Sequence, residues 1–219
     1  MEKKNQLKFI TIEGIDGAGK STYIPMIKNF LESQGQEVIV TREPGGTDLG
    51  EKLRTFLPSV EMTTLSETLL MFAPRAQHIE EKIKPALESN KWVICDRFTD
   101  STMAYQHGAK GLAESKVKML ETLVQEDIRP GLTLIFDVPL NISKERLSMT
   151  KKVPDKFERE SDEFFYKTIK AYKKIIKKDP ARCKIIDSSR SIDQTNDQVL
   201  TVLQDFYREF ENKPKMKLK

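Results

Sequence analysis

The stretch "IEGIDGAGKST", residues 12–22, decides the fold. It contains the pattern G-x-x-x-x-G-K-[ST] from Gly14 to Ser21, between a strand-like run at 7–13 and a helical pattern at 20–34. A glycine-rich turn that opens a helix directs several backbone N–H groups and the positive helix end at one anion. We therefore expect a phosphate-binding loop in which Lys20 meets the β and γ phosphates and the Ser21 hydroxyl ligates magnesium.

Short apolar runs alternate with longer helical patterns on both sides of this loop. The strand candidates are rich in β-branched residues and lie at 7–13, 37–41, 92–96, 132–138 and 183–188. Helical spacing marks 20–34, 66–89, 115–128 and 162–178. This alternation predicts an α/β fold of the P-loop NTPase type, with a parallel five-stranded sheet flanked by helices on both faces.

The chain of 219 residues fits a single domain spanning 1–219. The polar, weakly periodic segment at about 148–160 predicts a mobile, lid-like excursion, and the basic tail 213–219 predicts a frayed end. No long apolar run and no secretory leader is visible, so we expect a cytoplasmic protein. Cys95 and Cys183 have no metal-ligand spacing and predict two buried thiols. The net charge of +4 is small and spread along the chain, which suits anionic small molecules at least as well as nucleic acid.

A phosphate loop alone is compatible with a switch, a motor or a kinase. The Asn-Lys-x-Asp sequence of guanine-reading switches is absent, and a motor usually needs a longer chain. The second and third strand candidates are instead followed by "TREPGGT" (41–47) and "DRFTDSTMAYQ" (96–106). Asp96 is placed to hold magnesium or its water, and Arg97 to reach a second anion. A second anion site favours a nucleotide kinase.

These residues resemble the thymidylate kinase family. The resemblance runs from Phe9 to about Ile192, through "GIDGAGKST", "TREPGGT", "LGEKLR", "FAPRAQH", "DRFTDSTMAYQ" and "DKFERESDEFF". It implies magnesium-dependent transfer of the ATP γ-phosphoryl group to dTMP, which gives ADP and dTDP for dTTP biosynthesis, and a homodimer formed through helices. Neither nucleic acid nor a membrane is an expected partner. Gly17 replaces an arginine of another branch, so the chain resembles the bacterial branch, whose basic lid supplies the catalytic cations.

The resemblance also assigns roles to individual residues. It implies that Asp16 lies near the sugar hydroxyl, that Arg54 and Arg97 bind the monophosphate, and that the Glu43–Pro44 peptide is cis. The lid candidates are Arg146, Lys151, Lys152, Lys156 and Arg159. The expected ATP-binding residues are Gly14, Ile15, Asp16, Gly17, Ala18, Gly19, Lys20, Ser21 and Thr22. The expected substrate-binding residues are Asp16, Glu43, Pro44, Arg54, Phe72, Arg75, Arg97, Ser101, Tyr105 and Gln106. The expected catalytic residues are Lys20, Arg97, Asp16, Arg146 and Lys152, and the metal ligands Ser21 and Asp96.

The resemblance implies that Phe72 and Arg75 contact the base. The chemistry agrees, because Arg75 can donate to O4 of thymine and the Gln106 amide can pair with N3 or O2. Several alternatives remain open. Phe72 and Tyr105 could be core aromatics, Arg75 a surface charge, and Met71 rather than Phe72 the stacking residue. His107, where glycine is frequent, reads as a tolerated substitution. The chain could also phosphorylate another nucleoside or nucleoside monophosphate, or act as a non-catalytic nucleotide-binding switch.

Overall fold

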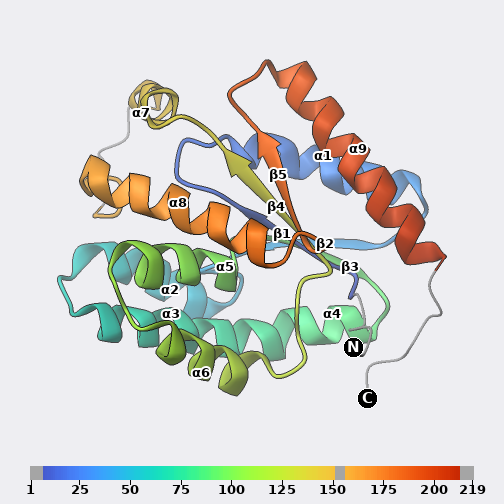
Figure 1. The fold of residues 1–219 in the computed structure, drawn as a ribbon. Coiled ribbons are helices and arrows are strands. Elements are labelled where there is room, and N and C mark those ends of the chain that lie inside the picture. Colours follow the sequence, from blue (N-terminus) through green and yellow to red (C-terminus); the bar gives the residue numbers. More distant parts are fainter. Residues whose placement is uncertain (1–6, 151–155, 213–219) are drawn as a thin grey trace.

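The core of the molecule is a parallel sheet of five strands, in the order β2-β3-β1-β4-β5 (Figure 1). The structure is a computed structural model, and it describes residues 7–150 and 156–212. The strands are β1 (Phe9–Glu13), β2 (Val38–Arg42), β3 (Trp92–Asp96), β4 (Leu132–Asp137) and β5 (Cys183–Asp187). The predicted fold class and all five predicted strands are therefore confirmed. Because the strands are parallel, the segments that follow β1, β2 and β3 gather at one edge of the sheet.

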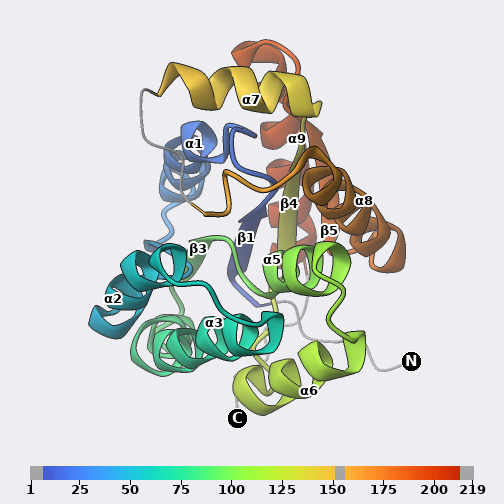
Figure 2. The ribbon, with the colours of Figure 1, turned by 90° about the vertical axis from the view of Figure 1, so that its left-hand side faces the viewer.

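Helices cover both faces of this sheet. Successive side chains of β3 show the division, because Trp92 packs against Phe206 and Phe210, whereas Val93 packs into a cluster with Ile83 and Leu87. The first face carries α1 (Lys20–Ser33) and α9 (Ile192–Glu211). The second face carries α3 (Thr64–His78), α4 (Lys84–Glu88), α5 (Thr99–Thr102), α6 (Glu114–Gln125) and α8 (Asp162–Lys178) (Figures 1 and 2).

The predicted helices match the structure closely. α8 has the bounds read from the sequence, because the Ser161 hydroxyl caps it by accepting from Phe164 N. The predicted helix 66–89 is a continuous helical run in which a π-helical segment, Ile79–Ile83, joins α3 to α4. Gly35, with a φ of 72°, follows the end of α1 as expected.

Five helical segments of the described residues were not predicted. They are α2 (Asp48–Phe56), the 3₁₀ helix Leu57–Ser59, α5 with its π-helical continuation Met103–Ala109, α7 (Leu140–Met149) and α9. α9 had a readable signal, since Ser191 and Gln194 form a capping box at its start. Of the expected lid, 148–149 belong to α7, whereas 151–155 and the tail 213–219 lie outside the described residues.

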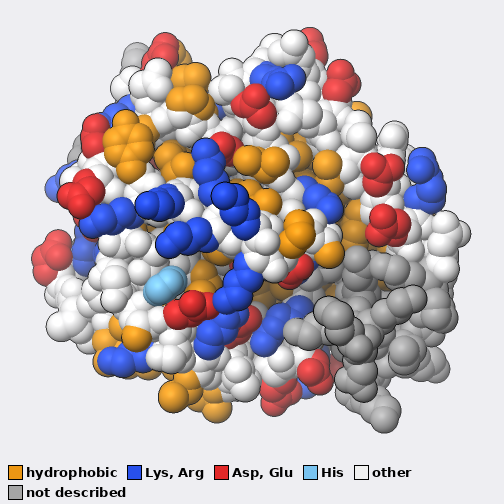
Figure 3. Space-filling model, viewed as in Figure 1, with side chains coloured by type: hydrophobic (Ala, Val, Ile, Leu, Met, Phe, Trp, Pro, Cys, Tyr) orange, Lys and Arg blue, Asp and Glu red, His pale blue; other side chains and the backbone are white. Residues whose placement is uncertain are grey.

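The positive charge is less evenly spread than the sequence suggested. Six exposed lysines lie on α8, and Figure 3 shows basic side chains gathered over that helix. These residues are Lys167, Lys170, Lys173, Lys174, Lys177 and Lys178. Cys95 and Cys183 are both buried free thiols, as predicted. Within the described ranges, no helix is both long and apolar enough to cross a bilayer.

Candidate active site

The glycine-rich loop between β1 and α1 is pressed against its neighbours. Gly14 has a φ of 137°, and a Cβ there would lie 2.6 Å from the carbonyl oxygen of Phe136. Gly17, with a φ of 74°, would bring a Cβ into the carbonyl oxygen of Ser143. The Ser143 hydroxyl on α7 donates to the carbonyl oxygen of Asp16 at 2.7 Å. The end of β4 and α7 therefore fix the conformation of the loop.

Lys20 is buried at the base of this loop. Its Nζ donates to the carbonyl oxygens of Gly14 and Ile15, at 3.0 and 2.9 Å. Burial and the charge of Arg97 together lower the pKa of Lys20 from 10.5 to about 8, against the opposing effect of Asp16. Two cations are thus held close together, an arrangement that suits a polyanion. Ser21 and Thr22 begin α1 with exposed side chains.

Arg97 connects the loop after β3 to the phosphate loop. Its Nη2 pairs with Asp16 Oδ1 at 2.6 Å, its Nη1 donates to Ser101 Oγ at 3.1 Å, and its guanidinium lies 5.2 Å from the centroid of the Tyr105 ring. Burial alone would raise the pKa of Asp16, but the charges of Arg97 and Lys20 overcome this effect and lower it. Arg97 itself adopts a left-handed backbone, with a φ of 69°.

Asp96 lies at the centre of a group of cations. It ends β3, and its charge acts on Lys20, Arg42, Arg54 and Arg97. Its Oδ1 is buried and has no hydrogen-bond partner within residues 7–150 and 156–212. A buried carboxylate oxygen without a donor fits the ligand set of magnesium, which prefers oxygen ligands. Asp96 and the hydroxyl of Ser21 could therefore hold that ion.

Further residues of the candidate site lie on the segment after β2 and on α3. The Glu43–Pro44 peptide is cis, as the family resemblance implied, and Arg54 Nη1 donates to the carbonyl oxygen of Pro44 at 3.0 Å. Arg75 on α3 is only 3% exposed, so the alternative of a surface charge is wrong. Its Nε donates to Glu43 Oε2 at 2.6 Å, and its guanidinium lies 4.6 Å from the centroid of the Phe72 ring. Phe72, at 2% exposed, thus flanks an arginine within the core.

The residues expected around the nucleoside divide into two groups. Tyr105 is buried beside Arg97, and its hydroxyl has no partner of normal hydrogen-bond geometry among the described residues. The Gln106 amide is directed elsewhere, because its Nε2 donates to the buried carboxylate of Glu67 at 2.9 Å. Thr102, which the sequence analysis did not single out, instead accepts from Arg75 Nη2 at 3.2 Å. Glu43, Phe72, Phe98 and Thr102 therefore surround the Arg75 guanidinium.

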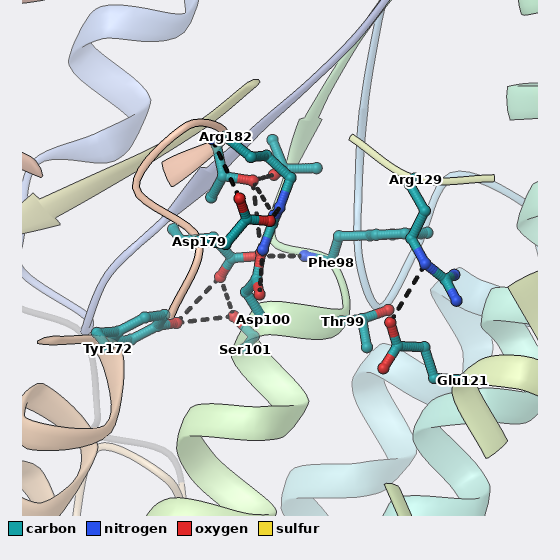
Figure 4. Close-up of polar contacts among 12 residues, drawn as sticks. Phe98, Thr99, Asp100, Ser101, Glu121, Arg129, Tyr172, Asp179 and Arg182 are labelled. Carbon is teal, nitrogen blue, oxygen red and sulfur yellow. Dashed lines mark hydrogen bonds and ion pairs between the residues drawn. The ribbon is translucent and has the colours of Figure 1, made fainter. Parts of the chain in front are cut away.

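Glu13 is a buried acid that the sequence analysis also missed. Its Oε1 accepts from Phe98 N at 2.7 Å, and its Oε2 accepts from Ser101 Oγ at 2.5 Å and from Tyr172 OH at 3.0 Å. Figure 4 shows the Ser101 and Tyr172 hydroxyls directed toward one another. Burial and the charge of Asp100 raise the pKa of Glu13 from 4.5 to about 7. Its position as the last residue of a buried strand, next to the glycine loop, was the available signal.

The basic lid candidates lie in different places. Arg146 is on α7 and donates to the carbonyl oxygens of Gly17 and Ser188, at 3.4 and 2.8 Å. Lys156 donates to the carbonyl oxygen of Val60 at 3.0 Å and lies 3.5 Å from Glu67. Lys151 and Lys152 fall outside the described residues. Of the candidates with described contacts, Arg146 is the one that reaches the phosphate loop.

A cavity of about 220 Å³ lies between α5, α6 and the segments that precede β4 and β5 (Figure 4). Its charged walls are paired with one another, since Arg182 Nη1 lies 2.5 Å from Asp100 Oδ2 and Arg129 Nε lies 3.5 Å from Glu121 Oε1. No residue of the phosphate loop lines it. This cavity is therefore separate from the candidate active site.

Comparison with known proteins agrees with this geometry. The family described as thymidylate kinase matches residues 12–199. A thymidylate kinase of Methylobacillus flagellatus is 50% identical over 91% of this chain and 98% of its own. One of Cupriavidus taiwanensis is 50% identical over 90% of this chain and 97% of its own. A crystal structure of thymidylate kinase from Ehrlichia chaffeensis superposes with a TM-score of 0.73 and is 38% identical, covering 90% of this chain and 97% of that one. The chain belongs to the thymidylate kinase family.

Proposed function

We propose that this protein transfers the γ-phosphoryl group of ATP to dTMP in the presence of magnesium, giving ADP and dTDP for dTTP synthesis. One observation carries the proposal beyond family membership. The ion pair between Arg97 and Asp16 joins the loop after β3 to the phosphate loop, so that Arg97 and Lys20 share one carboxylate. Phosphoryl transfer requires two anionic groups to meet end to end, and paired cations on adjoining loops supply the charge for that encounter.

On the donor side, residues 14–22 bind the ATP phosphates. Phosphate oxygens replace the carbonyl oxygens of Gly14 and Ile15 as acceptors for Lys20, which already donates two hydrogen bonds in this direction. Ser21 and Asp96 hold magnesium, which neutralises charge on the β and γ phosphates when bound. From α7, Arg146 supplies a further cation next to the loop.

On the acceptor side, Arg97 and Arg54 bind the monophosphate, with Ser101 orienting Arg97. The guanidinium fork suits two phosphate oxygens at once. Asp16 and Tyr105 lie against the sugar. The Tyr105 hydroxyl is buried and has no hydrogen-bond partner of normal geometry among the described residues, which supports a position beside the ligand.

The base lies at the far end of this pocket. Phe72 offers a flat apolar face, and Arg75 donates to O4 of thymine. Support comes from Arg75 Nη1, which is buried and has no hydrogen-bond partner among the described residues. Glu43 and Pro44 shape the wall, and Gln106 closes the pocket from the side of Glu67.

The protein acts as a cytoplasmic homodimer in this proposal. Three helices that pack side by side, α2, α3 and α6, carry exposed apolar side chains (Figure 2). These are Leu49, Phe56, Leu65, Leu69, Met119 and Leu123, of which the last two are 71% and 74% exposed. Exposed apolar side chains on adjoining helices favour association with a second copy. Light scattering should give twice the mass of the chain, and Leu69→Glu should reduce it to the monomer mass.

A panel of acceptors tests the reaction. ADP release should require dTMP, be weaker with dUMP and barely detectable with dCMP. ADP release that does not depend on any of the acceptors would favour a nucleotide-binding switch. Turnover with unphosphorylated thymidine alone would favour a nucleoside kinase.

Arg75→Ala tests the assignment of the base site. Thymine has an acceptor at position 4 where cytosine has a donor, so a guanidinium there attracts one base and repels the other. One methyl group contributes only about 1–3 kcal/mol, so this polarity should dominate the choice. The variant should lose much more kcat/KM for dTMP than for dCMP, whereas Arg190→Ala, on the exposed loop after β5, should leave both unchanged. An unchanged ratio in Arg75→Ala would remove Arg75 from base recognition.

A further inference from the structure

We infer that His78 is a positioning residue for base selection. It sets the orientation of Glu43, and Glu43 in turn fixes the guanidinium of Arg75. The inference rests on the proposed role of Arg75 in reading thymine. It assigns to Glu43 a different task from direct contact with the nucleotide.

The guanidinium of Arg75 is held on several sides. Its Nε donates to Glu43 Oε2 at 2.6 Å, and its Nη2 donates to Thr102 Oγ1 at 3.2 Å. The rings of Phe72 and Phe98 flank it, with centroids 4.6 and 5.2 Å away. Of its three nitrogens, Nη1 is the one without a partner in the described chain. The direction of that donor is therefore decided by the groups that hold the other two nitrogens.

Glu43 uses both carboxylate oxygens inside the protein. Its Oε2 accepts from Arg75, and its Oε1 lies 2.9 Å from His78 Nδ1. The residue is 4% exposed, and its backbone N donates to the carbonyl oxygen of Asp96 at 2.9 Å. With both oxygens engaged, Glu43 is oriented to hold a side chain rather than to receive a substrate hydroxyl.

His78 is completely buried, and both of its ring nitrogens have partners. Since a carboxylate only accepts hydrogen bonds, Nδ1 carries the proton directed at Glu43. In the neutral imidazole, the Nε2 atom then accepts from the Thr41 hydroxyl, 2.6 Å away. The ring is thus fixed by two directional contacts, one from β2 and one from the segment after it.

The glycine pair of "TREPGGT" leaves room for this arrangement. Gly46 has a φ of 78°, and a Cβ there would lie 2.5 Å from Thr41 Oγ1 and 2.6 Å from His78 Nε2. Arg75 and His78 are three positions apart on α3, so both side chains lie on one helix face toward that loop. The two motifs together therefore build one buried hydrogen-bonded chain, Thr41–His78–Glu43–Arg75.

The same side chains could suggest a metal site, since donor atoms of Glu43, His78 and Cys95 lie within 4.8 Å of one another. Each of these atoms already has a different partner. Arg75 and His78 occupy the Glu43 oxygens, Thr41 occupies His78 Nε2, and Cys95 Sγ donates to the carbonyl oxygen of Arg97 at 3.0 Å. The guanidinium beside Glu43 also opposes a second cation. The hydrogen-bonded chain is the better account.

Two amide substitutions separate the two ring nitrogens of His78. In His78→Asn the amide nitrogen takes the place of Nδ1 and can still donate to Glu43, whereas in His78→Gln it takes the place of Nε2 and cannot. We expect His78→Asn to keep the ratio of kcat/KM for dTMP over dCMP close to that of the unmodified protein. His78→Gln should lower the ratio by about tenfold or more, the effect expected for a lost hydrogen bond to a charged group. The loss should come mainly from a higher KM for dTMP, with the KM for ATP unchanged.

Equal ratios in His78→Asn and His78→Gln would overturn the inference, because a purely structural histidine predicts a common effect. Melting temperatures of both variants identify such a common loss of packing. Should either variant not fold, Glu43→Gln gives a second test, since its amide NH₂ must face either Arg75 or His78. An unchanged ratio in that variant would also overturn the inference. If Arg75→Ala itself leaves the ratio unchanged, the proposed base site fails. If Arg75→Ala lowers the ratio and His78→Gln does not, only the role of His78 fails.

Discussion

Replacing Glu13 by Gln should remove a pH-dependent cost to stability. The pKa of Glu13 is about 7 in the folded protein and 4.5 in an ordinary exposed glutamate. Between these values the folded state binds this proton and the unfolded chain does not, so stability falls as pH rises through that window and levels off above about pH 7. The two pKa values differ by about 2.5, and a difference of one pKa unit corresponds to about 1.36 kcal/mol. Above about pH 7, Glu13 therefore lowers the unfolding free energy by roughly 3 kcal/mol relative to low pH.

Gln is a suitable replacement because it imitates the protonated acid. Its carbonyl oxygen can still accept from Phe98 N, and its amide can donate to the hydroxyls of Ser101 and Tyr172, which can rotate to accept. Near pH 4.5 the two proteins should therefore be similarly stable. The advantage of Glu13→Gln should grow by about 2 kcal/mol between about pH 5.5 and about pH 8.5.

Urea unfolding of both proteins across this pH range measures the effect, because titrating groups that Glu13 does not influence cancel in the difference. Glu88→Gln, at an exposed glutamate at the end of α4, is the matched control measured under the same conditions. A constant difference for Glu13→Gln would refute the reasoning, since it would mean that Glu13 has the same pKa folded and unfolded.

Two further predictions concern the phosphate-binding cations. Lys20→Ala should nearly abolish ADP release. The circular dichroism spectrum and the melting temperature should remain close to those of the unmodified protein, because burial disfavours the charged form of Lys20 and the side chain therefore adds little stability. Normal turnover would show that Lys20 is not part of the donor site. Arg97→Lys keeps the charge but lacks the guanidinium fork that donates to Asp16 and Ser101 at the same time, so kcat at saturating dTMP should fall severely. If that kcat were unchanged, Arg54 or a lid residue would have to take its place.

The sheet and the phosphate loop could be read from the sequence because their signals are local. Central strands are continuous apolar runs, the glycine loop has fixed spacing, and α8 carries a cap and an apolar stripe within 18 residues or so. The sequence does not reveal α5, because the polar residues of "DRFTDSTMAYQ" show no helical periodicity of apolar side chains. α2 was hidden because it is short and mostly polar.

The arrangement of the site depends on contacts that are distant in sequence. Arg75 is buried because Glu43, 32 positions earlier, accepts from its Nε, and the Gln106 amide turns to Glu67, 39 positions earlier. The local pattern around Arg75 does not specify its contact with Glu43, and that around Gln106 does not specify its contact with Glu67. The sequence therefore predicts which residues belong to the site, but not which of them form hydrogen bonds with one another. Burial of Lys20 and the raised pKa of Glu13 arise in the same way, from layers that the chain brings together only when folded.

Asp16 competes with any acceptor for the Arg97 guanidinium, because the two residues already form an ion pair. A ligand that engages Arg97 has to draw it from a carboxylate 2.6 Å away, or share it. A phosphate monoester carries a charge of about −1.5 to −2 at pH 7, so it can compete with the single charge of Asp16 for the Arg97 guanidinium. An uncharged hydroxyl cannot. The ion pair therefore selects for negative charge at the acceptor position. A nucleoside with the correct base and sugar, or a neutral analogue, does not displace Arg97 from Asp16, even if its ring fits beside Phe72.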